Sequence, residues 1–231
     1  MKIVTNQKLV ERNAKIGRYS GIASLVILAG GMFLSFRFQN QVWYSLTALI
    51  LGFTLSQVSI FYSTRFARSP RPDQQLDAAL KGLDDRYAIY HYASPVSHVL
   101  VGPAGIWILF PFSQKGTITY NQKKERWQRK GGNLYMKFFA QDSIGRPSLE
   151  IETGKEQLRK KLTQIPEFEV PELHAALVFT HEEAEVEAED APAATLHALQ
   201  LKKMIRKREK SEQSLSMTAV RVVQDALDRE N

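Results

Sequence analysis

Two long stretches without a charged side chain lie near the N-terminus, and they restrict what this chain can fold into more than any other feature. The first extends from Tyr19 to Phe36 and the second from Phe38 to Thr64. As a helix rising about 1.5 Å per residue, each crosses most of the hydrocarbon core of a bilayer. Lipid offers no partner for backbone N–H and C=O groups, so a helix is the form expected of both. The sequence therefore predicts two transmembrane helices, at residues 19–36 and 41–62.

A short polar turn around Arg37 joins the two runs, which predicts a tight antiparallel hairpin. Trp43 and Tyr44 begin the second run, where aromatic rings favour the membrane interface. Gly30 and Gly31 either let the helices approach closely or are ordinary glycines of a membrane helix. A signal peptide is the alternative for the first run; its charged leader would be unusually long, and a second span follows.

Basic residues flank the pair of runs on one side. They precede the first run and follow the second: Lys2, Lys8, Arg12, Lys15, Arg18, Arg65, Arg68 and Arg71. The positive-inside bias then places both termini in the cytosol, in a multi-pass protein of the cell membrane.

The predicted parts of the chain are a basic segment at 1–18, the two spans within 19–64, a linker at 65–71, an α/β domain at 72–210 and an amphipathic helix at 211–231.

The amino-acid composition limits the kinds of site that the chain can contain. The chain has 231 residues, a net charge of +7 and no cysteine. The absence of cysteine excludes disulfides, thiolate metal sites and a cysteine nucleophile. The excess of basic residues suits nucleic acid or an anionic membrane surface as a partner. The alternative explanation for this excess is that membrane proteins are often basic beside their spans.

The residues after the linker predict a mixed α/β fold. The prolines at 70 and 72 mark its start, because a helix does not continue comfortably through them. Strands at 97–101 and 106–112 form a hairpin through the turn Gly102-Pro103-Ala104-Gly105. The other expected elements are helix 73–83, strands 87–92, 116–120 and 173–180, extended chain at 126–139, a helix from 151, an exposed acidic loop at 181–190, a basic helix at 195–210 and a helix at 215–227 with Leu215, Ala219, Val222, Val223 and Ala226 on its apolar stripe.

The hairpin segment SHVLVGPAGIWILFPFSQKG resembles the core of the NERD domain, the nuclease-related domain. DQQLDAAL resembles that family's first helix, KERWQRKGG its aromatic and glycine segment, and HAALVFT its late buried strand. The resemblance covers about Pro72 to Lys207. It implies a restriction-endonuclease-like mixed sheet with flanking helices, here preceded by the transmembrane hairpin. It also implies an Asp in the first hairpin strand and Glu-x-Lys in the second, since residues i and i+2 of a strand share one face and can hold a divalent metal with the Asp.

The chemical groups of that site are absent from this chain. Ser97 stands at the Asp position, and Phe110 and Phe112 stand at the Glu and Lys positions. Phenylalanine neither binds Mg²⁺ nor transfers a proton, so we expect no catalytic residue, no metal and no cofactor there. Asp73 is the one partial remnant, on the first helix. The alternative is a metal-dependent nuclease with rearranged acids, for which the candidates are Asp73, Asp77, Glu150 and Glu152.

Two further groups of residues are candidates for function. The histidines are scattered, and His181-Glu182-Glu183 is read as a solvated acidic loop. A basic segment with an interleaved aromatic is the candidate surface for nucleic acid or anionic lipid: Lys123, Lys124, Arg126, Trp127, Arg129 and Lys130. The sequence thus predicts a membrane-anchored, non-catalytic binding or scaffolding module, with nucleic acid as a candidate partner. The other alternative is a membrane-surface protein without a nucleic-acid role.

Overall fold

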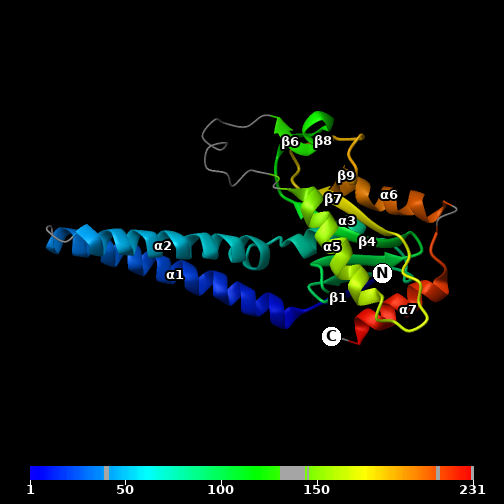
Figure 1. Ribbon diagram of the computed structural model, residues 1–231, viewed down its shortest axis with the longest axis horizontal. Coiled ribbons are helices and arrows are strands. Elements are labelled where there is room, and N and C mark those ends of the chain that lie inside the picture. Colours follow the sequence, from blue (N-terminus) through cyan, green and yellow to red (C-terminus); the bar gives the residue numbers. More distant parts are fainter. Residues whose placement is uncertain (39–41, 131–143, 145, 212–213, 230–231) are drawn as a thin grey trace. The chain divides into compact units, whose positions relative to one another are not determined.

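The computed structural model describes residues 1–38, 42–130, 144, 146–211 and 214–229 (Figure 1). The chain divides into two units. The helical unit is Asn6–Arg71, and the sheet unit combines Met1–Thr5 with Pro72–Asn231. The basic segment expected at 1–18 is therefore divided between them: its first residues are a strand, and the rest is the start of a long helix.

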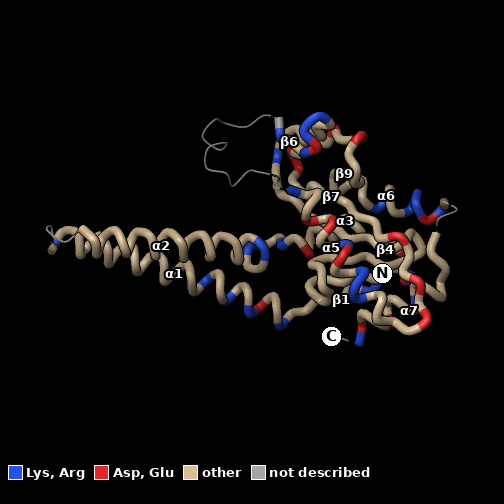
Figure 2. The backbone as a smooth tube through the Cα atoms, viewed as in Figure 1, with Lys and Arg blue, Asp and Glu red and all other residues tan. Residues whose placement is uncertain are grey.

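The helical unit is a pair of adjacent helices, α1 (Gln7–Arg37) and α2 (Val42–Tyr62), followed by a π-helical turn at Ser63–Ala67. Asn6 caps α1 by accepting a hydrogen bond from the Leu9 N–H. Both helices are long and apolar enough to cross a membrane, and few of their residues are buried. Figure 2 shows almost no Lys, Arg, Asp or Glu along most of the pair. This exposed apolar surface is what lipid would cover.

Small residues line the seam between α1 and α2. The Ser24 hydroxyl donates to the Gly52 carbonyl at 2.7 Å, and the Ser59 hydroxyl donates to the Gly17 carbonyl at 2.8 Å. Gly31 faces the Cβ of Ala48, and nothing lies within 4 Å of the place where a side chain would begin at Gly30. Of the two neighbouring glycines, Gly31 alone contributes to the close approach. Packing of small residues with interhelical hydrogen bonds is typical of helix pairs in lipid.

The sheet unit is built on a six-stranded mixed sheet with the strand order β1-β2-β3-β4-β7-β9. The β3–β4 hairpin is antiparallel, as is β2–β3, whereas β1–β2, β4–β7 and β7–β9 are parallel. These strands are β1 (Lys2–Thr5), β2 (Ala88–His91), β3 (His98–Gly102), β4 (Gly105–Phe112), β7 (Leu173–Phe179) and β9 (Ala194–His197). The mixed α/β architecture expected from the sequence is confirmed at this level.

Strand alternation decides which helices cover which face of the sheet. Ile89, Leu100 and Leu109 point to the face covered by α3 (Pro72–Leu80) and α6 (Ala198–Glu209). The residues between them, such as Tyr90 and Val99, point to the face covered by α5 (Pro147–Leu162) and α7 (Met217–Asp228). The buried stripe of α7 is Val220, Val223 and Leu227. The stripe expected from the sequence is right at Val223 and at Leu215, which packs against the same cluster just before the helix, and is displaced at its other three positions.

The strand expected at 116–120 belongs to a second, three-stranded sheet. It has the order β6-β5-β8, with β5 (Gly116–Asn121), β6 (Arg126–Lys130) and β8 (Ala184–Glu187). A short 3-10 turn, Gln122–Lys124, joins β5 to β6. The segment 116–120 therefore does not extend the six-stranded sheet. The segment 181–190, expected to be a loop, contains β8, which pairs with β5 in parallel, so ladder hydrogen bonds replace those that an exposed loop would make to water. The extended region expected up to residue 139 lies outside the described residues beyond Lys130.

Candidate functional site

The three positions aligned with the nuclease site lie where the β3–β4 hairpin ends. The β3–β4 ladder ends at the pair Val99 and Ile108; Ser97 precedes β3, and Phe110 and Phe112 lie further along β4. Ser97 is exposed, and its carbonyl accepts a hydrogen bond from the Tyr92 N–H at 2.7 Å. Phe110 packs against buried clusters that include Ile108 and Leu177. The space that a metal site would need is therefore occupied by hydrocarbon.

Phe112 packs in the same way, two residues further along β4. Its ring stacks on that of Phe179 with the centroids 5.4 Å apart. Gly154 of α5 leaves room for the Phe110 ring: a Cβ there would stand 3.4 Å from its Cζ. Aromatic pairs and buried rings stabilise a core, so these positions have a structural role.

The acids proposed for a rearranged site are not brought together. Asp73 is 2 % exposed and lies on α3, as does Asp77. Glu150 and Glu152 are exposed on α5, which covers the opposite face of the sheet. The described residues contain no group of three or more His, Asp or Glu side chains placed to hold a metal ion. Asp73 is also separated by the sheet from Phe110 and Phe112, so it does not complete a remnant of the nuclease site.

A buried polar chain that sequence reasoning missed joins α3 to the β2–β3 hairpin. His91 and His98 are cross-strand partners with their Nδ1 atoms 2.8 Å apart, and His91 Nε2 lies 3.0 Å from Asp77 Oδ1. If the carboxylate accepts from His91 Nε2–H, a neutral His91 accepts at Nδ1 and His98 Nδ1–H donates to it. The histidines are 0 % and 4 % exposed. Both rings are buried, so this row of hydrogen-bonded side chains links α3 to the sheet from within the sheet unit.

The basic hairpin β5–β6 only partly matches the predicted surface. Lys123, Lys124 and Arg126 are exposed. Trp127 is 4 % exposed, and its indole N–H donates to Thr195 Oγ1 at 2.9 Å. Strand alternation turns the Trp127 ring inward beside Tyr120, so in the described structure Trp127 is not part of the exposed basic surface. The side chain of Lys130 lies outside the described ones.

Acidic residues share the outer face of that second sheet. In the β5–β8 register Thr117 pairs with Glu185 and Thr119 with Glu187, and both glutamates are exposed. The Thr117 hydroxyl donates to a carboxylate oxygen of Glu185 at 3.3 Å. Cations at the β5–β6 turn and carboxylates on β8 therefore lie on the same small sheet, which weakens its attraction for a polyanion.

A more uniform basic surface lies on α6, where Figure 2 marks several cations. We call it the α6 cationic face and define it by its exposed residues: Leu199, Lys203, Arg206, Lys207 and Lys210. With Lys202 they line a groove of about 380 Å³. Lys203, Lys207 and Lys210 make no ion pair with any residue that the structure describes.

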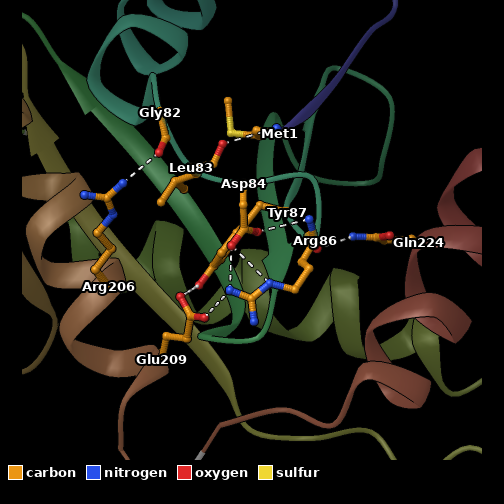
Figure 3. Close-up of polar contacts among 9 residues, drawn as sticks. All are labelled: Met1, Gly82, Leu83, Asp84, Arg86, Tyr87, Arg206, Glu209 and Gln224. Carbon is orange, nitrogen blue, oxygen red and sulfur yellow. Dashed lines mark hydrogen bonds and ion pairs between the residues drawn. The ribbon is translucent and has the colours of Figure 1, made fainter.

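The only acidic residue of α6 turns inward (Figure 3). One carboxylate oxygen of Glu209 pairs with the Arg86 guanidinium, and the other accepts from the Tyr87 hydroxyl at 2.9 Å. Burial and the Glu209 carboxylate raise the pKa of Tyr87 above its usual range. Arg86 also binds Asp84 and thereby lowers the pKa of that carboxyl. Both acids are thus neutralised internally.

Two cations of α6 attach this helix to the segment that follows α3. Lys202 Nζ donates to the Lys81 carbonyl at 2.9 Å, and Arg206 Nη2 donates to the Gly82 carbonyl at 2.7 Å. These carbonyls follow the C-terminus of α3, where the helix dipole favours positive charge. Arg206 therefore serves structure and surface at once, whereas the lysines at 203, 207 and 210 remain available to a partner.

A separate cavity of about 320 Å³ lies beside α5 and the start of β7. Trp107, Trp127 and His174 form part of its wall, together with the charged side chains of Glu152 and Lys155. Burial lowers the pKa of His174, against the opposing effect of Glu172. Arg208 Nη2 donates to His174 Nε2 at 3.4 Å, which requires the neutral ring. Charges of both signs line the cavity, and they select no ligand class.

Comparison with family models, curated proteins and solved structures finds no match for this chain. The resemblance to the NERD domain therefore rests on the quoted segments alone. Two features of the described residues bear on function: packed rings at the positions aligned with a nuclease site, and unpaired cations on α6.

Proposed function

We propose that this protein is a membrane-anchored binding or scaffolding module. The helical unit crosses the cell membrane as a hairpin, and the sheet unit lies in the cytosol as a non-catalytic NERD-like domain. The length and apolar surface of α1 and α2 support the anchor. The aromatic packing of Phe110 and Phe112 supports the non-catalytic reading.

Strand β1 is the single observation that carries the topology. It precedes α1, whereas its partner β2 follows α2 in the chain, and the two strands are hydrogen-bonded neighbours. Paired strands lie on the same side of a membrane. If α1 and α2 both span the bilayer, the N-terminus and the sheet unit share one side, as an even number of crossings requires. The basic flanks then favour the cytosol for that side.

Cysteine accessibility in intact cells tests this topology, because the natural chain has no cysteine. Phe38→Cys lies at the turn of the hairpin and should react with a membrane-impermeant maleimide added outside. Gln122→Cys, exposed in the sheet unit, should react only after the membrane is permeabilised. Reaction of the Gln122→Cys variant in intact cells, or reaction of the Phe38→Cys variant only after permeabilisation, contradicts the proposed topology.

A nuclease assay tests the non-catalytic part. The full chain in detergent is incubated with plasmid and single-stranded DNA in Mg²⁺ or Mn²⁺. We expect no cleavage above background, since metal-assisted hydrolysis needs carboxylates to hold the ion. Asp73→Ala and Glu152→Ala serve as controls, one for each face of the sheet. Metal-dependent cleavage that either substitution removes would establish the nuclease alternative.

A further inference from the structure

We infer that the α6 cationic face docks on anionic lipid headgroups of the membrane that holds the helical unit. The inference rests on the proposed function, because it assumes the transmembrane anchor. It assigns a binding surface and a partner class that the anchor alone does not specify.

The α6 cationic face carries only positive charge because Glu209, the acidic residue of the helix, binds residues outside this face. Glu209 is bound by Arg86 and Tyr87 and does not offset the neighbouring lysines. Lys203, Lys207 and Lys210 have no acidic partner in the part of the chain that the structure describes. Each Lys or Arg close to an anionic leaflet strengthens binding about fivefold, within a Debye length of the surface. Exposed lysines of this kind suit phosphate-bearing headgroups.

Leu199 favours a lipid surface over other polyanions. Its side chain is 85 % exposed, and it begins the helical row Leu199, Lys203, Arg206 and Lys210, whose spacing places all four on one side of α6. An apolar side chain in line with cations suits the boundary between headgroups and acyl chains, where leucine inserts and lysines reach the phosphates.

Nucleic acid fits this face less well. The α6 sequence, ALQLKKMIRKRE, contains no aromatic side chain that could stack on a base. In addition, an anchored domain meets lipid at a high effective concentration, whereas a soluble polymer has to be recruited from solution. The same lysines therefore meet headgroups first.

The test uses the full chain with one introduced cysteine, reconstituted in nanodiscs. A polarity-sensitive fluorophore is attached at Leu199→Cys or, as a matched control, at Glu156→Cys on α5, which covers the opposite face of the sheet. In discs with about one-third phosphatidylglycerol we expect a blue shift at position 199 that is absent in phosphatidylcholine discs and is reversed by high salt. No shift is expected at position 156.

Charge removal identifies the surface responsible. Lys203→Gln, Lys207→Gln and Lys210→Gln together should abolish the shift at position 199. The matched triple Lys123→Gln, Lys124→Gln and Arg126→Gln removes the same charge from the β5–β6 hairpin and should leave the shift unchanged. The inference is overturned if anionic lipid produces no shift, if the hairpin triple abolishes it, or if DNA added to phosphatidylcholine discs produces the larger shift. Loss of the chain from the discs on alkaline extraction would instead contradict the proposed anchor.

Discussion

His174 lies half-buried between the Trp107 ring and the backbone of Gly105, with the histidine and indole centroids 4.8 Å apart. Gly105 has a φ of +103°, and a Cβ there would stand 3.2 Å from His174 Cδ2, so glycine suits both the turn and the packing. The pKa of His174 is lowered mainly by burial; Glu172 opposes the effect, and Arg208 and Lys155 add to it. Folding therefore favours the neutral ring.

This direction predicts how His174 affects stability as pH changes. The folded pKa lies below that of the unfolded chain, so the unfolded state takes up the proton first as pH falls below about 6.5. The stability contributed by the neutral ring is present above that pH and is lost as pH falls through the folded pKa. His174→Gln should therefore reduce the drop in melting temperature of the sheet unit between pH 7 and pH 5, measured by circular dichroism in detergent.

His181 provides the control for this measurement. It lies in the turn before β8, where its Nδ1 accepts from the Glu183 N–H. A His181→Gln variant that reduces the pH dependence as much as His174→Gln does would contradict the assignment to His174.

At the scale of elements, β1 is a short edge strand whose contribution can be measured by a matched pair of prolines. The Lys2 N–H donates to the Tyr87 carbonyl at 2.8 Å. Alternation in a parallel ladder then directs the Val4 N–H toward β2 and the Ile3 N–H away from it. Val4→Pro removes a ladder hydrogen bond and leaves a carbonyl of β2 without its donor, at a cost of about 1–3 kcal/mol.

Ile3→Pro is the control, because an edge strand tolerates proline where its N–H faces solvent. Ile3 is also 50 % exposed, so the loss of its side chain removes little packing. Denaturant unfolding in detergent should show the larger loss of stability for Val4→Pro. Equal losses for the two variants would mean that β1 does not pair with β2 in this register.

At the scale of the whole molecule, the division into two units predicts how the protein can be divided experimentally. Residues 72–231 contain every element of the sheet unit except β1. A soluble chain of these residues should fold, since a domain of this size can bury its own core. It should be less stable than a version in which residues 1–5 are fused to Pro72 through a flexible Gly/Ser linker.

Comparison of the 72–231 chain with the fused chain tests the contribution of β1 to the sheet as well as the division into two units. Circular dichroism and thermal melting without detergent should show a higher melting temperature for the fused chain. If the 72–231 chain only aggregates while the fused chain is soluble, β1 is needed for folding. If both aggregate, the sheet unit depends on the helical unit and the division is wrong.

The sequence by itself determined those features that depend on local chemistry. The apolar runs predict α1 and α2 because their composition alone sets how each meets lipid or water. The β3–β4 hairpin follows from the Gly102-Pro103-Ala104-Gly105 turn, whose residue types restrict the backbone within four residues. Phenylalanine at positions 110 and 112 already excluded the expected metal ligands.

Only the tertiary structure decided the features that join distant residues. Lys2 pairs with Ala88, and Glu209 turns from the lysines beside it to Arg86. Four-residue strands and single charged side chains carry no local signal of such partners, because the partner's position depends on how the whole sheet is assembled. The inward direction of Trp127 was likewise decided by strand register, since a one-residue shift would turn the ring to solvent. The choice of α6 over the β5–β6 hairpin as the uniform basic surface follows from these long-range contacts.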